Sequence, residues 1–254
     1  MKKNVVLGLV GLTSMFLVSL GVSFFITVKA PYYHDKKIRE QVGSQVVTVY
    51  GKRGGGSGFF VKAPSGKVYI LTNYHVCQLK DENNILQIKL PGQDRTIPKQ
   101  VLEMYKTHDL CLVESIEGFS GLNVANNVKV GETVAIVGHP RLFPLVVSKS
   151  QVIGEQEISL YYNKKLSMPI VFNPNSFSID KLLQLKIYSG RGDYVLRTLK
   201  STQLIGYSRG GSSGSPIVNF DGEVVAVLFA GIISDNMVSY GVPLRFIEEF
   251  LSVY

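Results

Sequence analysis

The sequence predicts an all-β protein with one C-terminal helix, preceded by an apolar N-terminal segment. Three observations support this prediction. Short β-branched runs recur from residue 44 onward, turn residues separate those runs, and 24 consecutive residues near the N-terminus carry no charge. With 45% hydrophobic and 18% charged residues, the 254-residue chain is neither a disordered protein nor a coiled coil.

The apolar segment Val5–Val28 is typical of a membrane anchor. As a helix it would be about 36 Å long, which exceeds the roughly 30 Å of hydrocarbon in a bilayer. A cleaved signal peptide usually has a shorter apolar core, and Pro31 would hinder cleavage after the nearest small residue. We therefore expect an uncleaved signal anchor or transmembrane helix in residues 1–30, with a cleaved signal as the alternative. Residues 31–44 would form a juxtamembrane linker and residues 45–254 the folded domain.

The net charge of +8 does not indicate a nucleic-acid-binding protein. Half of the excess lies in residues 1–44, and the rest is spread thinly with no basic run interleaved with aromatic residues. We expect no nucleic-acid partner. Basic residues are more numerous after the apolar segment than before it, so charge counting does not place the C-terminal domain outside the cytoplasm.

Short strands are predicted along most of the chain. The β-branched runs include Val46–Tyr50, Lys67–Leu71, Ile85–Ile88 and Thr133–Val137. The turn residues that separate strands include Gly54–Gly56, Pro64–Gly66, Pro91–Gly92 and Asp221–Gly222. This spacing is typical of a β-sandwich or a β-barrel. Residues 155–200 show the least clear strand or helix periodicity.

The C-terminal residues follow a helical period instead. After Pro243, apolar residues share one helical face and two glutamates lie on the other. The apolar face consists of Leu244, Ile247, Phe250 and Leu251, and the polar face carries Glu248 and Glu249.

A glycine-rich turn carries the strongest chemical signal. Residues 210–216 read Gly-Gly-Ser-Ser-Gly-Ser-Pro and precede a short apolar strand. Glycines allow neighbouring N–H groups to converge, and acyl transfer needs both an exposed nucleophile and donors for the developing oxyanion. An ordinary Gly/Ser loop would have the same composition, so this turn alone does not identify an enzyme.

A serine nucleophile also needs a base and a carboxylate that orients the base. Of the four histidines, His75 stands at the end of an apolar strand, whereas His34, His108 and His139 lie beside the apolar segment or in turns. Asp109 opens another apolar strand, where an unpaired carboxylate would be costly. Each placement has a structural explanation by itself, but their order of His, Asp and Ser indicates a serine hydrolase.

Several motifs resemble those of the HtrA-like (Deg) serine proteases, which have the trypsin fold. The resemblance covers about residues 45–254, with the motifs in the order of the family, and no PDZ module follows within the sequence. The motifs are Gly56–Val61, Leu71–Val76, Asp109–Val113, Val137–Pro140, Gly211–Pro216 and Tyr240–Pro243.

The resemblance implies two six-stranded antiparallel β-barrels with the active site between them. His75 would act as the base, Asp109 would orient it, and Ser213 would be the nucleophile. The N–H groups of Gly211 and Ser213 would form the oxyanion hole. The family chemistry implies no cofactor and no metal ion.

The resemblance also implies a substrate pocket that contains Tyr207, Gly231 and Gly241. Tyr207 stands six residues before Ser213, at the base of the primary specificity pocket, and it is not acidic. We therefore expect small or apolar side chains to be preferred over Arg or Lys.

The chain has two cysteines, Cys77 and Cys111. We expect two small buried core residues, with a disulfide as the alternative if their Cα atoms lie within about 7 Å. Two cysteines without histidines at a suitable spacing do not predict a metal site.

Together these features predict a membrane-anchored serine endopeptidase that acts on proteins or peptides. The enzyme type favours a domain outside the cytoplasm, on the periplasmic or extracellular side. The alternative is a protease-fold binding protein with a closed or inactive site. The sequence leaves the oligomeric state undecided, and the resemblance allows a homo-oligomer because HtrA-like proteins often form trimers.

Overall fold

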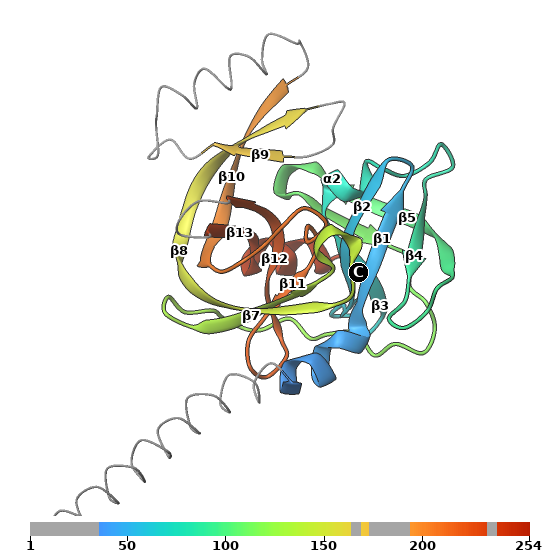
Figure 1. Cartoon of the computed structure of the whole chain (residues 1–254), viewed down its shortest axis with the longest axis horizontal. Coiled ribbons are helices and arrows are strands. Elements are labelled where there is room, and N and C mark those ends of the chain that lie inside the picture. Colours follow the sequence, from blue (N-terminus) through green and yellow to red (C-terminus); the bar gives the residue numbers. More distant parts are fainter. Residues whose placement is uncertain (1–35, 164–168, 173–193, 233–237) are drawn as a thin grey trace, which may run out of the picture. The chain divides into compact units, whose positions relative to one another are not determined.

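The computed structural model describes residues 36–163, 169–172, 194–232 and 238–254. By its contacts the chain divides into two units, Met1–Lys37 and Ile38–Tyr254, and the strands that the structure describes all lie in the second (Figure 1). The apolar segment Val5–Val28 lies outside the described residues. Among the residues that are described, no helix combines the length and the apolar character needed to span a bilayer.

The first half of the second unit is a closed six-stranded barrel. Its strands are β1 (Val46–Gly51), β2 (Gly54–Lys62), β3 (Val68–Thr72), β4 (Ile85–Lys89), β5 (Thr96–Tyr105) and β6 (Leu110–Val113). The order around the barrel is β1-β2-β3-β6-β5-β4, and antiparallel pairing of β1 with β4 closes it. All four strands that the β-branched runs predicted are present, three in this barrel and one in the next.

The second half is a seven-stranded sheet, of which six strands close into a second barrel. Its strands are β7 (Thr133–Gly138), β8 (Val146–Asn163), β9 (Pro169–Phe172), β10 (Tyr194–Ile205), β11 (Pro216–Val218), β12 (Val224–Ile232) and β13 (Val238–Pro243). The order is β10-β13-β12-β11-β7-β8-β9, and pairing of β10 with β8 closes the ring, so β9 is an addition outside it. The structure thus confirms the double six-stranded barrel, while the transmembrane helix stays a prediction.

The run Gly54–Gly56 is part of a strand, so the prediction of a turn was wrong. Gly55 pairs with Tyr50 and Gly56 with Val49 in the β1–β2 ladder. A Cβ atom on Gly55 would overlap the carbonyl oxygen of Val49. The glycines therefore allow two backbone segments to lie close together within the sheet, and they do not reverse the chain.

Three clusters of buried apolar side chains hold the two barrels. One fills the first barrel and includes Phe60, Ile70 and Leu86, and another fills the second barrel and includes Val134 and Leu228. The third lies between them and combines side chains from both. It includes Phe59, Leu71 and Leu110 of the first barrel, Val137, Val218 and Tyr240 of the second, and Ile38 and Val42 of the helical residues before η1 (Gly43–Gln45).

The predicted C-terminal helix is α4 (Leu244–Leu251), and its apolar face is buried as expected. Although it follows the second barrel, it also contacts the first. The ring of Phe246 stacks on His108 at a centroid distance of 3.7 Å, and Phe250 stacks on Tyr105 at 5.5 Å. The Tyr105 hydroxyl donates a hydrogen bond to Glu249 over 2.9 Å. The helix therefore fastens the two barrels together.

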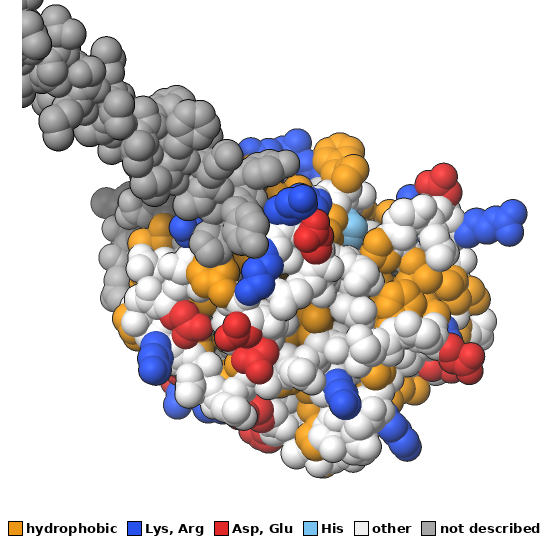
Figure 2. Space-filling view, turned by 90° about the horizontal axis from the view of Figure 1, so that it is seen from below, with side chains coloured by type: hydrophobic (Ala, Val, Ile, Leu, Met, Phe, Trp, Pro, Cys, Tyr) orange, Lys and Arg blue, Asp and Glu red, His pale blue; other side chains and the backbone are white. Residues whose placement is uncertain are grey.

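Charges are interspersed on the surface that Figure 2 presents. Lys and Arg side chains alternate with Asp and Glu among apolar and neutral groups, and they form no single basic field on this face. A mixed surface of this kind gives little electrostatic attraction for a polyanion.

Candidate active site

His75 lies at the rim of the first barrel, in the one-turn helix α2 (Tyr74–Cys77) that follows β3. Asn73, two residues before His75, has extended backbone angles. Its side-chain Nδ2 donates a hydrogen bond to the carbonyl oxygen of Asp109 over 3.0 Å. His75 is only 4% exposed. The end of β3 and the start of β6 therefore hold the histidine beside Asp109.

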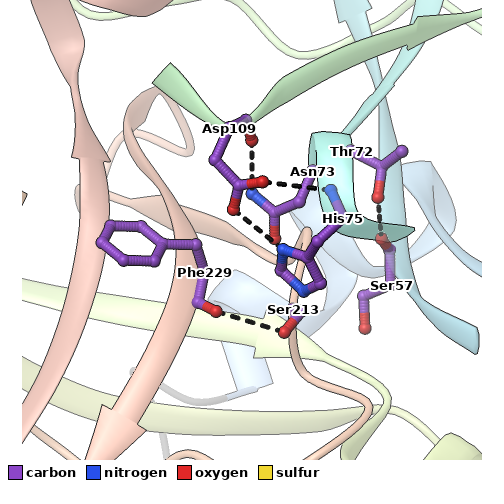
Figure 3. A network of polar contacts seen from close by, with 7 residues as sticks. All are labelled: Ser57, Thr72, Asn73, His75, Asp109, Ser213 and Phe229. Carbon is purple, nitrogen blue, oxygen red and sulfur yellow. Dashed lines mark hydrogen bonds and ion pairs between the residues drawn. The ribbon is translucent and has the colours of Figure 1, made fainter. Parts of the chain in front are cut away.

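Asp109 is fully buried and has a left-handed backbone conformation, with φ 56° and ψ 41°. It follows the short turn η2 (Lys106–His108) and precedes β6. Aspartate tolerates this conformation better than most residues, and here it turns the carboxylate toward α2. Oδ1 accepts the main-chain N–H of His75 over 3.0 Å, and Oδ2 lies 2.8 Å from Nδ1 of the same residue (Figure 3).

This pair of contacts determines the tautomer of the His75 imidazole. A carboxylate accepts hydrogen bonds, so the Nδ1 atom of His75 carries the proton in the 2.8 Å contact. The Nε2 atom is then the one with a lone pair. In Figure 3 the imidazole points toward Ser213, which lies on the opposite side from Asp109.

The two cysteines form a disulfide, so the expectation of two reduced core residues was wrong. The Cα atoms of Cys77 and Cys111 are 6.4 Å apart, within the range that a disulfide spans, and both residues are fully buried. Cys77 stands two residues after His75, and Cys111 stands two residues after Asp109. The bond therefore ties α2 to β6 directly behind the histidine–aspartate pair.

Ser213 comes from the second barrel, in the loop between β10 and β11. Its hydroxyl donates to the carbonyl oxygen of Phe229 in β12 over 3.3 Å. The sequence-predicted His75, Asp109 and Ser213 are thus brought to one place from both barrels (Figure 3).

Hydrogen bonds hold the carbonyl groups of the residues that precede Gly211 and Ser213. Gly211 has a φ of 90°, and the carbonyl oxygen of Gly210 accepts the N–H of Arg141 over 2.6 Å. The carbonyl oxygen of Ser212 accepts the N–H of Ser215 over 3.0 Å. Within the described part of the chain, no group accepts a hydrogen bond from the N–H of Gly211 or of Ser213.

These two N–H groups are the pair that the sequence predicts for the oxyanion hole. Because a trans peptide points its C=O and N–H in opposite directions, anchoring the Gly210 and Ser212 carbonyls aims the following N–H groups the other way. Donors fixed in this way are available to a charged oxygen that develops during a reaction.

The first barrel approaches the nucleophile loop closely. The N–H of Ser57 in β2 donates to the carbonyl oxygen of Ser213 over 2.7 Å. Gly214 has a φ of 85°, and a Cβ atom there would overlap the carbonyl oxygen of Ser57. Gly56 is also constrained, because its Cβ atom would lie 2.7 Å from the Ser213 carbonyl oxygen. Glycine at 56 and 214 thus lets the two barrels meet at the site.

The residues predicted for the substrate pocket lie in different surroundings. Tyr207 is half-buried after β10, with the guanidinium of Arg209 4.9 Å from the centre of its ring. Gly231 in β12 lies against Ser208, where a Cβ atom would overlap the hydroxyl oxygen. Gly241 in β13 is buried, and a Cβ atom there would lie 2.7 Å from Ile217. Their role in binding substrate stays a prediction.

His139 lies behind the nucleophile loop, just before the turn η3 (Pro140–Leu142). It is 7% exposed, and its Nδ1 donates to the carbonyl oxygen of Phe143 over 2.9 Å. Burial lowers the pKa of His139 below its usual value, although the hydrogen bond to Phe143 opposes this effect. Burial therefore favours the neutral form of this imidazole.

Metal-ligating side chains do not gather in the part of the chain that the structure describes. Among those residues, no group of three or more His, Cys, Asp or Glu side chains is arranged to hold a metal ion. The expectation of a site without a metal ion or cofactor stays a prediction.

A family profile described as a trypsin-like peptidase domain matches residues 56–227, which contain His75, Asp109 and Ser213. The chain belongs to the trypsin-like peptidase family. The double barrel agrees with this assignment, and the membership accounts for the order of the sequence motifs.

Relatives of this trypsin-like peptidase domain include two HtrA-type proteins. The chain is 25% identical over 203 residues to "Serine protease HtrA-like" of Staphylococcus aureus (strain USA300), covering 77% of this chain and 23% of that protein. It is 24% identical over 213 residues to "Serine protease Do-like HtrA" of Bacillus subtilis (strain 168), covering 78% and 40%. The predicted resemblance to HtrA-like proteases is confirmed, and the chain spans about a quarter of the length of the S. aureus relative.

Solved structures of similar fold include two bacterial proteases. The Rv3671c protease from M. tuberculosis in its active form superposes with a TM-score of 0.61 at 17% identity, covering 85% of this chain and 82% of that chain. The serine endoprotease from Yersinia pestis gives a TM-score of 0.58 at 16% identity, covering 86% and 66%. At these identities the comparison establishes the fold.

Sequence reasoning missed two groups that shape the site, the side chains of Ser57 and Asn73. Ser57 lies within the Gly-Ser-Gly run that identified the family, and Asn73 stands two residues before His75. Both signals were present in the motifs, but a motif does not say which atoms its polar side chains contact.

Proposed function

We propose that this protein is a serine endopeptidase in which His75, Asp109 and Ser213 form the catalytic triad. The observation that carries the proposal is the 2.8 Å contact between Nδ1 of His75 and Oδ2 of Asp109, with the imidazole directed at Ser213. Because the tautomer is fixed, Nε2 is the atom that takes a proton from the serine hydroxyl.

In the first half of the reaction, Ser213 Oγ attacks the carbonyl carbon of the scissile peptide bond while its proton passes to His75 Nε2. The resulting oxyanion accepts hydrogen bonds from the N–H groups of Gly211 and Ser213. The C–N bond then breaks, and the imidazolium of His75 gives the proton to the leaving amine. An acyl ester on Ser213 remains.

In the second half, a water molecule replaces the amine. His75 takes a proton from this water, whose oxygen attacks the ester carbonyl, and the same two N–H groups stabilise the second oxyanion. The Ser213 Oγ–carbon bond breaks, the proton returns to Oγ, and the peptide leaves as a carboxylic acid. Asp109 keeps its negative charge throughout and stabilises the imidazolium.

A second candidate function is a binding protein with a closed site. The hydroxyl of Ser213 donates to the carbonyl oxygen of Phe229 over 3.3 Å, an arrangement that directs its proton away from His75. In the proposed reaction the hydroxyl gives up this bond and donates to Nε2 of His75 instead. The open N–H groups at residues 211 and 213 favour the enzyme over the binder.

The disulfide supports a domain outside the cytoplasm. Structural disulfides are rare in cytosolic proteins, because the cytosol keeps thiols reduced, and they persist in secreted and periplasmic domains. The Cys77–Cys111 bond is therefore typical of a domain outside the cytoplasm. In this proposal Val5–Val28 anchors the domain to the membrane, and proteins or peptides on the outer side are its substrates.

The proposal is tested with the variant Ser213→Ala. Wild-type protein should hydrolyse fluorescein-labelled casein and react with a fluorophosphonate probe, and Ser213→Ala should do neither while keeping its thermal unfolding midpoint. Ser65→Ala, at an exposed turn, is the matched control and should behave as wild type. Equal turnover by Ser213→Ala would exclude the triad, and an unlabelled wild type would favour the binding protein.

Anchoring and sidedness need a separate experiment. Membranes from cells that express the full chain are separated from the soluble fraction, and right-side-out vesicles or protoplasts are treated with an external protease. An anchored outer domain should remain with the membrane and be degraded. Recovery in the soluble fraction contradicts the anchor, and protection from the external protease contradicts the outer location.

A further inference from the structure

The hydroxyl of Ser57 is a buried group that the triad mechanism does not use. Ser57 lies in β2 of the first barrel and is fully buried. Its Oγ donates to the carbonyl oxygen of Gly211 over 2.9 Å and accepts the main-chain N–H of His139 over 2.9 Å. One hydroxyl therefore joins the loop of the nucleophile to the turn that follows β7.

The other polar atoms of Ser57 are also engaged. Its N–H donates to the carbonyl oxygen of Ser213 over 2.7 Å, and its carbonyl oxygen accepts the Thr72 hydroxyl over 2.7 Å (Figure 3). Thr72 is the last residue of β3, three residues before His75. Ser57 thus contacts the strand that precedes His75 on one side and the loop that carries Ser213 on the other.

We infer that the Ser57 hydroxyl positions the oxyanion hole. Holding the carbonyl of Gly211 limits the rotation of the peptide that follows this residue, and glycine at a φ of 90° has no Cβ atom to limit it. Without an anchor, this loop can turn a carbonyl rather than an N–H toward the site.

The second bond of the hydroxyl acts on the neighbouring peptide group, which joins Gly210 to Gly211 and carries the Gly211 N–H. His139 precedes the turn in which Arg141 donates its N–H to the carbonyl oxygen of Gly210 over 2.6 Å. Arg141 and Leu142 both have left-handed backbone angles, with φ of 55° and 62°. Two successive residues in this conformation are strained, so external bonds such as Ser57 Oγ to His139 help to hold the turn.

The two bonds therefore converge on Gly211. Its carbonyl is fixed directly by Ser57, and its N–H is aimed through Arg141 and the Gly210 carbonyl. Ser57 is fully buried, so its hydroxyl holds the loop rather than binding substrate. It is a positioning residue, and its contribution is greatest in the transition state, when the oxyanion has formed.

The inference rests on the proposed peptidase function, and the variant Ser57→Ala tests it. We expect kcat on fluorescein-labelled casein to fall about 10- to 100-fold, less than the loss when a donor itself is removed. The apparent KM should stay within about twofold, because the lost interaction forms only in the transition state. The rate of fluorophosphonate labelling should fall in parallel with kcat, since that reaction also places an oxygen in the hole.

Ser201→Ala is the matched control. Ser201 is fully buried in the second barrel, and its hydroxyl likewise donates to a main-chain carbonyl, that of Gln156 over 3.0 Å. The unfolding midpoints of the two variants should fall by similar amounts, whereas kcat should fall only for Ser57→Ala. Equal losses of kcat in both variants would reduce Ser57 to a general stabilising role and overturn the inference.

Ser57→Cys is a second variant that tests the inference, because a thiol is similar in size to the hydroxyl but donates a weaker hydrogen bond. Its kcat should lie between those of wild type and Ser57→Ala, and this variant decides the matter alone if Ser57→Ala does not fold. An active wild type with kcat unchanged in a folded Ser57 variant overturns the positioning role only. A wild type inert toward both casein and the probe overturns the proposed function and this inference together.

Discussion

The carboxylate of Asp109 contacts His75 at two points, the main-chain N–H over 3.0 Å and the ring Nδ1 over 2.8 Å. The first bond fixes where the start of α2 lies, and the second fixes how the imidazole is turned. The same carboxylate therefore sets both the position and the tautomer of the base.

The variant Asp109→Asn should keep the fold and lose most of the activity. Asparagine tolerates the left-handed conformation, but its amide presents a donor and an acceptor where the aspartate presents acceptors only. The imidazole then adopts the wrong tautomer, and kcat on casein should fall by about 10³- to 10⁴-fold.

The measurement is turnover of labelled casein, with circular dichroism to confirm folding. Asp94→Asn, at an exposed residue, is the matched control and should retain full activity. Activity within about tenfold of wild type in Asp109→Asn would mean that the carboxylate does not orient the base.

Removal of the disulfide should destabilise the domain. The bond closes a loop of 34 residues, and the chain-entropy treatment gives about 4 kcal/mol for a loop of that length. Urea unfolding of Cys77→Ala/Cys111→Ala should therefore have a lower midpoint than wild type. Because the bond lies behind His75 and Asp109, we also expect lower kcat in the double variant.

A reductant provides the control for this prediction. Dithiothreitol under partly unfolding conditions should lower the midpoint of wild type toward that of the double variant and leave the double variant unchanged. Identical midpoints for the oxidised wild type and the double variant would contradict the prediction.

His139 should make the domain less stable in mild acid. Its pKa is lowered by burial in the folded state, whereas in the unfolded chain it stays near 6.5. The unfolded chain therefore binds a proton first as the pH falls below about 6.5, and this proton favours unfolding. The domain has its full free energy of unfolding, as far as His139 is concerned, above about pH 6.5. That free energy decreases progressively as the pH falls below this value.

Urea unfolding of wild type and His139→Gln at about pH 7.5, 6.5 and 5.5, on both sides of the ordinary histidine pKa, checks this point. The free energy of unfolding should decrease more steeply with falling pH in wild type than in His139→Gln. The comparison cancels the other titrating groups, which the two proteins share. Parallel slopes would show that His139 has the same pKa in both states.

Gly56→Ala should disturb the site more than the fold. An added Cβ atom would lie 2.7 Å both from the carbonyl oxygen of Ser213 and from Cγ2 of Val76. The methyl group must therefore push the nucleophile loop away from α2, so casein turnover and fluorophosphonate labelling should both fall by at least about tenfold, the loss typical of a misplaced reacting group.

Gly92→Ala is the comparison for this variant. A Cβ atom on Gly92 would meet no other atom within 4 Å, and the left-handed backbone there makes alanine mildly unfavourable. It should lower the unfolding midpoint slightly and leave turnover unchanged. If Gly56→Ala is as active as Gly92→Ala, the close approach of β2 to the loop has no role in activity.

The sequence predicted the strands that have clear β-branched runs. It also singled out His75, Asp109 and Ser213, because the motifs around them are local, and the structure brings these three residues to one place (Figure 3). The long pairing of β8 with β10 could not be predicted from the sequence. Its register joins residues such as Ser159 and Thr198, and the segment between them has no clear sequence pattern. The glycine run at 54–56 looked like a turn because composition alone does not distinguish a reversal from a tight backbone contact.

The disulfide and the role of Ser57 depend on distances between segments that are remote in the chain. Cys77 and Cys111 are 34 residues apart, and Ser57 and Gly211 are 154 apart. No periodicity reports such contacts. The approach of one barrel to the other creates them, and that packing is set by the buried side chains between the barrels.

The stacking of α4 on the first barrel has a consequence for how the protein is made. Phe246 covers His108, the residue directly before Asp109, so the outer face of that turn is completed by a helix translated more than a hundred residues later. A ribosome releases the first barrel before this covering helix emerges from the exit tunnel. A nascent chain therefore completes the packing around the turn before Asp109 only after nearly the whole domain has been synthesised.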